Sequence, residues 1–537
     1  PSTRHNGAGG AGNGSRPYPL RPVHVAVRPL SIPGGIPAHP ILLTSCATVP
    51  LPIKSCLLLM GEDLQAKPPL CVDLDGTLIK TDLLWESLLV LLKQNPLLMV
   101  LLPWWLFKGK AYLKHEIARR VTLDASTLPY DRELIEFLAN ERREGRELML
   151  ATASHVSYAQ AVATHLGLFD QRVFGSDRSV NLKGVRKVAL LVERYGTRRF
   201  AYAGNSTADF PVWAEASEAI VVNASAGVVS RARTLTTVSR VFSTPVTWVK
   251  QVAKALRVHQ WAKNVLVFVP VIASHQLTNG RLLLQAGLAF LSFSLCASSV
   301  YIVNDCLDLE SDRRHPRKRN RPFASGSLSI PFGLALAAAC LLGGVLLAFA
   351  LPRLFLLVLV GYLALTTAYS FYLKQFVLLD VIVLAQLYTV RVYGGGAATD
   401  VAPSHWLLTF SLFLFLSLAL VKRFTELRLM SQAEGEGLPG RGYWVTDVEH
   451  ISSIGTASGL LAVLVLALYI SSKEVLLLYT HADVLWLVCP VMLYWISRVW
   501  MLAYRNRMDD DPVVFAVKDP KSYAMAAVIG AILFFAK

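Results

Sequence analysis

Apolar residues follow two different patterns along the chain, and the pattern changes near residue 257. In the first part, short apolar runs alternate with helical patterns, which is typical of a doubly wound sheet covered by helices on both faces. We therefore expect a multi-domain protein whose α/β domain occupies residues 60–225. The expected strands are 70–74, 148–152, 200–203 and 219–222.

An insertion over residues 79–140 follows the first expected strand and contains the apolar stretch LLWESLLVLLKQNPLLMVLLPWWLFKG. Polar residues and Pro96 interrupt this stretch, so each half is shorter than the roughly 20 residues that span a bilayer. Two interpretations remain open for the insertion. It is either a helical hairpin lying on the membrane surface or a buried helical cap of the α/β domain.

From Trp261 onward the chain carries nine apolar runs, most of which approach the length of a transmembrane helix. They predict an all-α polytopic bundle of about nine transmembrane helices over residues 257–537, after a basic amphipathic linker at 226–256. The first and last runs are short, which is compatible with tilted or re-entrant segments. The runs lie near 261–276, 282–303, 329–350, 354–372, 377–395, 405–421, 452–470, 485–504 and 523–536.

Composition and charge support a membrane protein over a nucleic-acid binder. Hydrophobic residues make up 53% of the chain and charged residues 17%, although the net charge is +16. One set of loops between the apolar runs holds 15 Lys and Arg residues and the other set holds 3, so the basic set is expected in the cytoplasm. We expect an integral protein of a bacterial inner membrane, with its α/β domain and active site cytoplasmic and no nucleic-acid partner. The basic loops are 304–328, 373–376, 422–451 and 505–522, and the others are 277–281, 351–353, 396–404 and 471–484.

Residues 1–59 contain five basic residues, no acidic ones, and many Gly, Pro and Ser residues. This composition predicts a disordered or non-native leader, and Met60 is the expected natural start. The seven cysteines form no CxxC pair or metal-type spacing, so free thiols are expected.

The strongest chemical signal follows the second apolar run, in YIVNDCLDLESDRRHPRKRNRPFASG. Asp305, Asp308 and Asp312 are spaced by three and four residues, which places them on one face of a continuous helix. Three carboxylates that close together need a cation, and hard oxygen ligands suit Mg²⁺. Arg321 is the candidate for contacting phosphate oxygens, because Arg binds them in a bidentate manner.

The pattern N-D-x-x-D-x-x-x-D followed by R-P resembles the UbiA-type membrane prenyltransferase superfamily over about residues 250–537. The resemblance implies an all-helical bundle with a central cavity open to lipid. It also implies Mg²⁺ at Asp305, Asp308 and Asp312, with Asn304 in the substrate site, binding a diphosphate leaving group. Three further segments at bilayer edges supply candidate substrate-binding residues: Lys263 and Asn264; Tyr369 and Lys374; and Lys422, Arg423 and Glu426.

Aromatic prenyltransferases of this superfamily usually carry a second D-x-x-x-D after the sixth span, and this chain does not. In this respect the chain is more similar to the decaprenyl-phosphate phosphoribosyltransferase-like branch. That similarity implies phosphoribosyl diphosphate as the donor and a polyprenyl phosphate lipid as the acceptor. The alternatives are an aromatic polyprenyltransferase, with 4-hydroxybenzoate or a similar acceptor, and a non-catalytic membrane scaffold. Two arginines within expected spans, Arg391 and Arg498, are either functional or directed to an interface.

The segment CVDLDGTL resembles the first motif of haloacid-dehalogenase (HAD)-type phosphotransferases, in which the first Asp is the nucleophile and the second is the acid and base. The resemblance implies Asp73 and Asp75 in these roles, with Mg²⁺ relieving charge repulsion. It also implies Thr152 as the second-motif hydroxyl and Lys183 as the third-motif cation, with Lys187 as a rival. Asn205 and Asp209 match the metal-binding fourth motif, in which Asn205 replaces the usual Asp. The domain is therefore either an active phosphatase, removing the 5-phosphate from the transferase product, or a structural or regulatory relic. The oligomeric state is left open.

Overall fold

The computed structural model describes residues 67–169, 172–243, 245, 247–432, 437–438, 440–508 and 512–537. The predictions of a leader at 1–59 and of a natural start at Met60 lie outside the described residues. All elements described below belong to one compact unit, Ala66–Lys537.

Six parallel strands form one sheet near the start of the described chain, in the order β3-β2-β1-β4-β5-β6. This order has β1 at its centre and the chain winding outward in both directions, as in doubly wound folds. The expectation of an α/β region with a parallel sheet is therefore confirmed. The strands are β1 (Leu70–Val72), β2 (Leu148–His155), β3 (Val173–Ser176), β4 (Ala201–Gly204), β5 (Glu218–Val222) and β6 (Thr237–Phe242).

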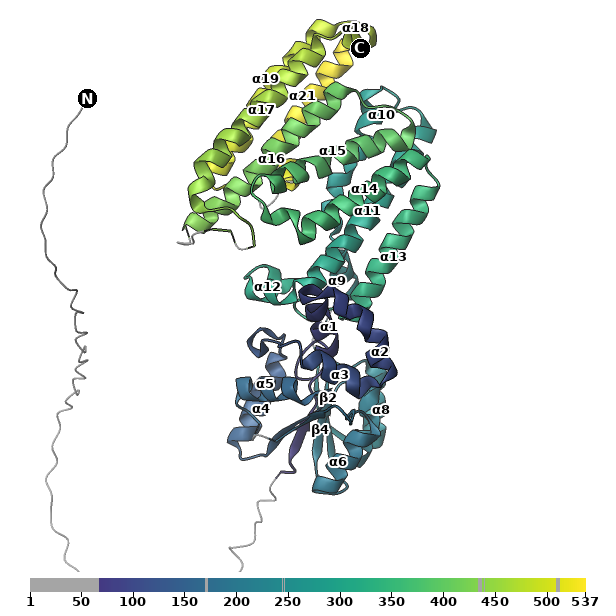
Figure 1. Cartoon of the computed structure of the whole chain (residues 1–537), viewed down its shortest axis with the longest axis vertical. Coiled ribbons are helices and arrows are strands. Elements are labelled where there is room, and N and C mark those ends of the chain that lie inside the picture. The colour runs from purple at the N-terminus through teal and green to yellow at the C-terminus, as the bar shows by residue number, and fades with distance from the viewer. Residues whose placement is uncertain are drawn as a thin grey trace, which may run out of the picture. The chain divides into compact units, whose positions relative to one another are not determined.

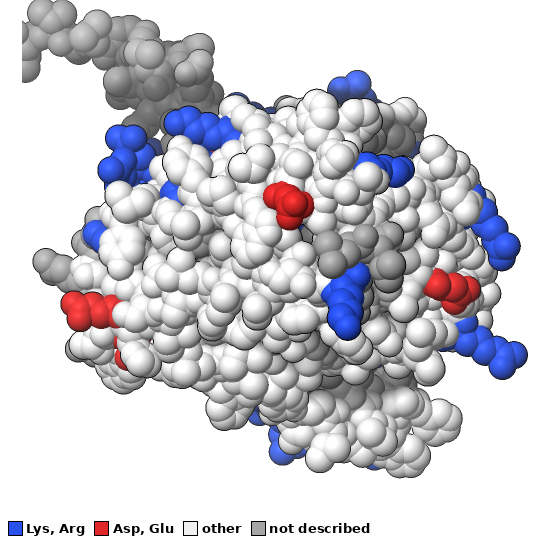
Figure 2. Space-filling model, turned by 90° about the horizontal axis from the view of Figure 1, so that it is seen from above, with Lys and Arg blue, Asp and Glu red and all other residues white. Residues whose placement is uncertain are grey.

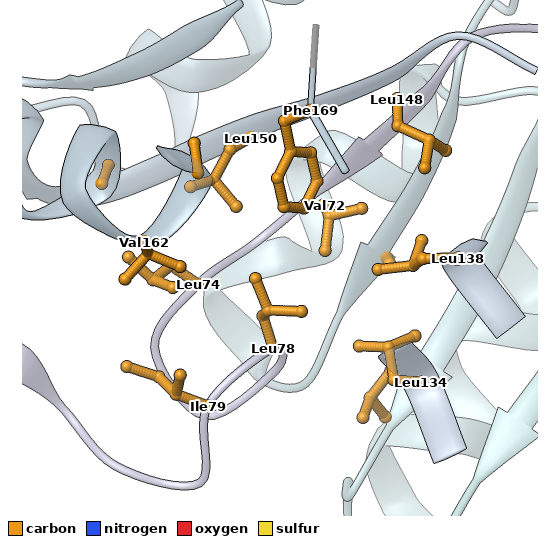
Figure 3. Close-up of a cluster of buried hydrophobic side chains, with 14 of the residues drawn as sticks. Val72, Leu74, Leu78, Ile79, Leu134, Leu138, Leu148, Leu150, Val162 and Phe169 are labelled. Atoms are coloured by element: carbon orange, nitrogen blue, oxygen red, sulfur yellow. The ribbon is translucent and has the colours of Figure 1, made fainter. Parts of the chain in front are cut away.

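Helices cover both faces of this sheet, because alternate residues of each central strand point to opposite faces. Figure 1 shows α4 and α5 on one side of β2 and β4, and α6 and α8 on the other. Leu70 and Val72 pack with α4 and α5, whereas Cys71 packs with α6, α7 and α8. Figure 3 shows Leu134 and Leu138 of α4 directed at the strand residues. The helices are α4 (Arg132–Arg143), α5 (Val156–Leu166), α6 (Val185–Tyr195), α7 (Phe210–Glu215) and α8 (Ala226–Leu235).

The α/β unit extends beyond the boundary expected at residue 225. The segment expected as a linker at 226–256 contains α8 and the edge strand β6, which pairs with β5, followed by α9 (Trp248–Ala255). Exposed polar residues such as Ser239 and Arg240 give β6 the appearance of a basic linker in the sequence. Its β-branched residues nevertheless favour a strand.

The insertion after β1 is packed at its start and exposed further along. Helix α1 packs against α3 and against two helices of the membrane region, α11 and α13. The following segment is exposed and apolar: Val100 and Phe107 are 77% and 85% accessible. Such a surface is typical of a segment that contacts a membrane or a partner. The insertion consists of α1 (Leu83–Gln94), η1 (Pro96–Leu101), α2 (Leu102–Phe107), α3 (Lys110–Ala118) and η2 (Ala125–Thr127).

Seven of the described helical segments are long and apolar enough to cross a membrane, which supports an integral membrane protein. The first of the nine expected spans corresponds to η4 and α10 and the last to α21, a helix of 17 residues, and neither is among these seven. The spans lie in α11 (Gly280–Leu307), α13 (Ile330–Phe349), α14 (Arg353–Phe371), α15 (Leu379–Thr399), α16 (His405–Gln432), η7 with α17 (Val445–Asp447, Val448–Ile470) and η8 with α19 (Ala482–Leu487, Val488–Tyr504). The remaining elements are η4 (Val258–Phe268), α10 (Val269–Ala273), α12 (Leu309–Arg314), η5 (Lys318–Asn320), η6 (Leu373–Gln375), α18 (Lys473–Leu478), α20 (Pro512–Lys518) and α21 (Pro520–Ala536).

The end of the bundle that carries α18 and the C-terminus has few charged side chains. Viewed from above in Figure 2, this end is largely white, with scattered blue and red residues. The loops with few basic residues, including the one between α17 and η8, are at this end.

Candidate active sites

The first candidate site lies at the carboxyl edge of the sheet, where ligands bind in open α/β folds. Asp73 directly follows β1, and its backbone N–H donates to the carbonyl of Ala203 on β4. Gly76 then turns the chain with a φ of 76°, and a Cβ added there would lie 2.1 Å from the amide nitrogen of Asn205. A side chain at position 76 would therefore displace Asn205.

Asp73 is neutralised by Lys187, which lies on the first turn of α6. The Lys187 ammonium donates to Asp73 Oδ1 and to the Tyr202 hydroxyl, both at 2.7 Å. Lys183, the expected cation, lines the same cavity but precedes the turn at Gly184 that starts α6. The structure thus places Lys187, and not Lys183, against the Asp73 carboxylate.

Asp75 is held at both carboxylate oxygens. Its Oδ1 accepts the backbone N–H of Leu83 at 3.0 Å, and its Oδ2 accepts the Ser154 hydroxyl at 2.6 Å and the Thr152 hydroxyl at 3.4 Å. The structure therefore brings Thr152 to Asp75. Ser154 was missed, because β2 continues past the expected strand end and brings a second hydroxyl to the site.

Burial changes the protonation of both aspartates. It raises the pKa of Asp73 to about 6, although the charge of Lys187 opposes the shift. Burial also raises the pKa of Asp75 to about 7, with a smaller contribution from the neighbouring Asp82 carboxylate. Asp75 is thus able to carry a proton near neutral pH, whereas Asp73 has a cation at its carboxylate.

These residues line a cavity of about 400 Å³ that also contains lysines from the insertion. Lys110 and Lys114 of α3 share the cavity wall with Lys183 and Lys187, so four lysines lie in the same cavity as the aspartates.

The donor set around this cavity fits Mg²⁺ only weakly. Asp209 accepts the backbone N–H groups of Asn205 and Ser206 and the Tyr202 hydroxyl, so its oxygens are already engaged. Asn205 can ligate only through a neutral carbonyl oxygen. A metal would therefore rely on Asp73 for most of its negative charge.

The second candidate site lies where α11 ends. Helix α11 stops at Leu307, and Asp308 caps it with φ −106° and ψ 20° before α12 begins. The expectation that the three aspartates share one face of a continuous helix is therefore wrong at Asp308, because the helix is interrupted there. Asp305 and Asp312 are buried, and Asp308 is partly exposed.

Asp305 and Asp312 converge on one cationic nitrogen. Arg321 Nη1 lies 2.9 Å from Asp305 Oδ1 and 2.7 Å from Asp312 Oδ2, and Arg257 also donates to Asp305. Burial raises the pKa of Asp312, against the opposing charge of Arg321. Because one cation between these carboxylates contacts both, the pair fits a divalent cation. Within the described ranges, however, no three Asp, Glu, His or Cys side chains are grouped to hold a metal.

Asp308, the third expected metal ligand, instead contacts the insertion of the α/β unit. Lys93 Nζ of α1 lies 2.8 Å from Asp308 Oδ1 and 3.4 Å from the carbonyl oxygen of Leu307. No local pattern in the sequence indicates this contact, because the two residues are 215 positions apart.

The other expected substrate residues fall into two groups of contacts. In the first, the buried Asn264 donates to Ser294 and accepts from Arg391 Nε at 2.7 Å, and Arg391 also donates to Tyr362. Arg391 is therefore held inside the bundle and does not reach an interface. Elsewhere, Asn304 donates to Ser370 on α14, Lys263 lies over the ring of Tyr388, and Arg498 forms a two-bond ion pair with Asp519.

The second group surrounds the fully buried Asp380. Arg423 lies 2.6 Å from Asp380 and also pairs with Glu426, so its charge is neutralised inside the bundle. Arg441, which the sequence did not single out, donates to Asp380 and to the Tyr369 hydroxyl, each at 3.3 Å. Lys422 precedes Arg423 on α16.

Lys374 lies at the turn between α14 and α15, in η6. Burial lowers the pKa of Lys374, and the Asp308 carboxylate opposes the shift. This interaction brings Lys374 into the electrostatic surroundings of the acidic motif.

A known family matches this region. A family model described as the UbiA prenyltransferase family matches residues 265–518. An uncharacterized protein, y4nM, of Sinorhizobium fredii is 38% identical over 470 residues, which are 86% of this chain and 90% of that protein. The nodulation protein NoeC of Azorhizobium caulinodans is 38% identical over 275 residues, 50% of this chain and 87% of that protein.

The chain belongs to the UbiA prenyltransferase family. Within the family, a decaprenyl-phosphate phosphoribosyltransferase of Mycobacterium tuberculosis is 41% identical over 194 residues. That match covers 34% of this chain and 63% of the mycobacterial protein. The UbiA match includes Asn304, the three aspartates and Arg321, whereas the α/β unit lies outside it.

Proposed function

We propose that this UbiA-family transferase moves a phosphoribosyl group from phosphoribosyl diphosphate to a polyprenyl phosphate. The observation that carries the proposal is the convergence of Asp305 and Asp312 on one cation position. The 41% identity to a decaprenyl-phosphate phosphoribosyltransferase supports the choice of donor and acceptor. The loops that carry Asp308, Lys374 and Lys422 belong to the set with the higher Lys and Arg content, which supports a cytoplasmic site.

The residues around Asp305 and Asp312 would hold the diphosphate. Bound Mg²⁺ would neutralise the charge that develops on the departing diphosphate. Arg321 and Arg257, now on the carboxylates, would turn their remaining N–H groups to phosphate oxygens. The bond from the anomeric carbon to the diphosphate breaks as a lipid phosphate oxygen bonds to the same carbon. Because that oxygen is already anionic, no general base is needed.

Lys374 and Lys422 are the proposed contacts of the lipid phosphate. Lys374 is partly buried beside the acidic motif, so its ammonium would hold an anion close to the reacting carbon. Arg423 has a supporting part in this proposal, because Asp380 and Glu426 neutralise it.

Labelled substrates would test this function on the full chain in detergent. With Mg²⁺, labelled phosphoribosyl diphosphate and a polyprenyl phosphate should give a labelled lipid. Asp305→Asn should reduce the rate roughly 100-fold or more, because it removes charge at the metal position. Glu310→Gln on the following helix α12 is the control, since Glu310 forms an exposed pair with Arg314.

The same preparation separates the alternatives. Label transfer from a prenyl diphosphate to 4-hydroxybenzoate, without transfer from phosphoribosyl diphosphate, would contradict the proposal and favour an aromatic prenyltransferase. No transfer with either pair, together with full cellular function of Asp305→Asn, would favour a scaffold.

A second proposed activity is removal of the 5-phosphate from the lipid product by the α/β unit, acting as a HAD-like phosphatase. The contact between Lys187 and Asp73 supports it, because that cation would hold the carboxylate ready to attack phosphorus. Asp75, with its raised pKa, would protonate the leaving ribose oxygen as the phosphorus–oxygen bond breaks. Water would then hydrolyse the aspartyl phosphate and release inorganic phosphate.

Phosphate release by the full chain from prenyl-phospho-ribose 5-phosphate would test the second activity. Asp73→Asn should abolish release without affecting phosphoribosyl transfer. Equal release by Asp73→Asn and the unchanged protein, or none from either, would contradict it.

A further inference from the structure

Helix α1 of the insertion contacts both candidate sites. At its start, the backbone N–H of Leu83 donates to Asp75 in the α/β unit. Further along, Glu86 pairs with Arg313 of α12, the short helix that carries Asp312. One helix of 12 residues therefore lies against the residues of both sites.

The pair between Glu86 and Arg313 fixes α1 beside the acidic motif. Two parallel hydrogen bonds join the side chains, at 2.9 and 2.5 Å, and both side chains are at least nine-tenths buried. Arg313 Nε also donates to the carbonyl of Ala324 at 2.8 Å, so the guanidinium is held on two edges. A buried two-bond pair of this kind has a defined geometry, because breaking it leaves an uncompensated charge.

Lys93 follows Glu86 by seven residues, which is close to two turns of an α-helix. The two side chains consequently lie on the same face of α1. With Glu86 fixed on Arg313, Lys93 is placed at Asp308, where its ammonium lies 2.8 Å from Oδ1. The position of Lys93 is thus determined by a buried contact some 10 Å along the helix.

The ion pair between Lys93 and Asp308 is much more exposed than the ion pair between Glu86 and Arg313. Lys93 and Asp308 have 53% and 37% of their side-chain surface exposed, compared with 7% and 6% for Arg313 and Glu86. An exposed pair contributes little stability, so a stronger ligand can replace either partner. The pair lines a cavity of about 430 Å³ between α1 and the end of α11, which leaves room beside the ammonium.

Asp308 interacts with a second lysine besides Lys93. The charges acting on Lys374 include that of the Asp308 carboxylate and those of the cations Arg441, Lys93 and Lys318. Two lysines that interact with one carboxylate, itself an expected metal ligand, suit an anion bound together with a metal.

We propose that Lys93 is a diphosphate-binding residue of the transferase site, supplied by the insertion of the α/β unit. Without metal, Lys93 neutralises Asp308. When Asp308 turns to the metal, the Lys93 ammonium donates to a phosphate oxygen of the diphosphate. This inference rests on the proposed transferase function.

Binding of pyrophosphate and of Mn²⁺ to the full chain in detergent would test this inference without turnover. Lys93→Gln should weaken pyrophosphate binding at saturating Mg²⁺ by about tenfold, the typical effect of losing a hydrogen bond between charged groups. The same variant should bind Mn²⁺ alone more tightly, because the cation that competes for Asp308 is gone. These opposite effects would not arise if Lys93 only joined the insertion of the α/β unit to the membrane region. Lys93→Arg should bind pyrophosphate nearly as well as the unchanged protein.

Arg314→Gln is the matched control, because it removes another exposed ion pair between α12 and the insertion, Arg314 with Asp124. It should change neither affinity. Unchanged pyrophosphate affinity in Lys93→Gln, or an equal loss in Arg314→Gln, would overturn the role of Lys93. If the unchanged protein shows no Mg²⁺-dependent pyrophosphate binding, or if Asp305→Asn binds it equally, the proposed transferase function itself fails.

Discussion

Asp380 and Arg423 form an ion pair in which neither side chain has exposed surface, with 2.6 Å between the charged atoms. The sequence suggested that Arg423 binds a lipid phosphate, but a cation already neutralised by a buried carboxylate has little charge to offer a ligand. The pair joins α15 to α16 and draws in Tyr443, whose hydroxyl donates to Asp380. Its primary effect is therefore expected on stability.

Arg423→Met should lower the stability of the protein, because it leaves Asp380 buried without a full partner. Removing one member of a buried pair typically costs about 3–5 kcal/mol. A thermal unfolding scan in detergent measures the change, with Arg353→Gln at an exposed helix start as the control. Unchanged stability with weaker lipid binding would contradict this prediction and return Arg423 to the lipid site.

The two lysines near Asp73 should have unequal effects on phosphate release. Lys187→Met removes the hydrogen-bonded cation from Asp73 and should reduce release roughly 100-fold or more, since the carboxylate then tends to be protonated. Lys183→Met keeps that contact and should reduce release less than about tenfold, through weaker attraction of the anionic substrate. Rates of phosphate release by both variants test this prediction. A larger loss in Lys183→Met than in Lys187→Met would make Lys183 the cation that acts on Asp73.

Phosphate release should fall as the pH rises above neutrality. Burial raises the pKa of Asp75 to about 7, so its carboxyl group is protonated below pH 7 and loses its proton above it. If the protonated form donates to the leaving oxygen, the rate falls about tenfold per pH unit above the pKa. A profile of kcat/KM from pH 5 to 9 tests this. Asp75→Asn should leave a slower activity that lacks the alkaline decline; an unchanged profile in this variant would exclude Asp75 as the acid.

Local signals in the sequence predicted the parallel sheet, the apolar helices and the acidic motif. Alternating residues such as Leu70 and Cys71 face opposite layers of the α/β unit, and such periodicity is visible in a short window. Contacts across long separations could not be predicted in this way. Lys93 contacts Asp308 and Glu86 pairs with Arg313, and each pair spans more than 200 residues.

The choice between Lys183 and Lys187 had a local cause that the motif did not reveal. Both lysines fit the spacing, but Gly184 starts α6 with a φ of 57°, which leaves Lys183 outside the helix. The break at Asp308 is similar: spacings of three and four predict one helical face only while the helix continues.

Asn205 offers a direct test of whether the α/β unit is an active phosphatase or a relic. Asp209 is engaged with backbone N–H groups, so Mg²⁺ in this cavity would depend on Asp73 for its charge. Asn205→Asp would add a further carboxylate to a cavity wall that already holds Asp73 and Asp209, and it should tighten Mg²⁺ binding about tenfold or more. Without metal the new carboxylate would repel Asp73 and Asp209, so the variant should unfold at a lower temperature than the unchanged protein in EDTA. When Mg²⁺ is added, the unfolding temperature of the variant should rise by more than that of the unchanged protein.

Thermal scans with and without Mg²⁺, together with phosphate release, separate the two possibilities. In an active enzyme limited by its metal, Asn205→Asp should lower the Mg²⁺ concentration needed for half-maximal release. Asn205→Ala, which removes the amide oxygen, should raise it. If Asn205→Asp binds Mg²⁺ tightly and still releases no phosphate, the loss of metal charge is not what limits the site. The α/β unit would then act through α1 and Lys93 on the transferase, and not through chemistry of its own.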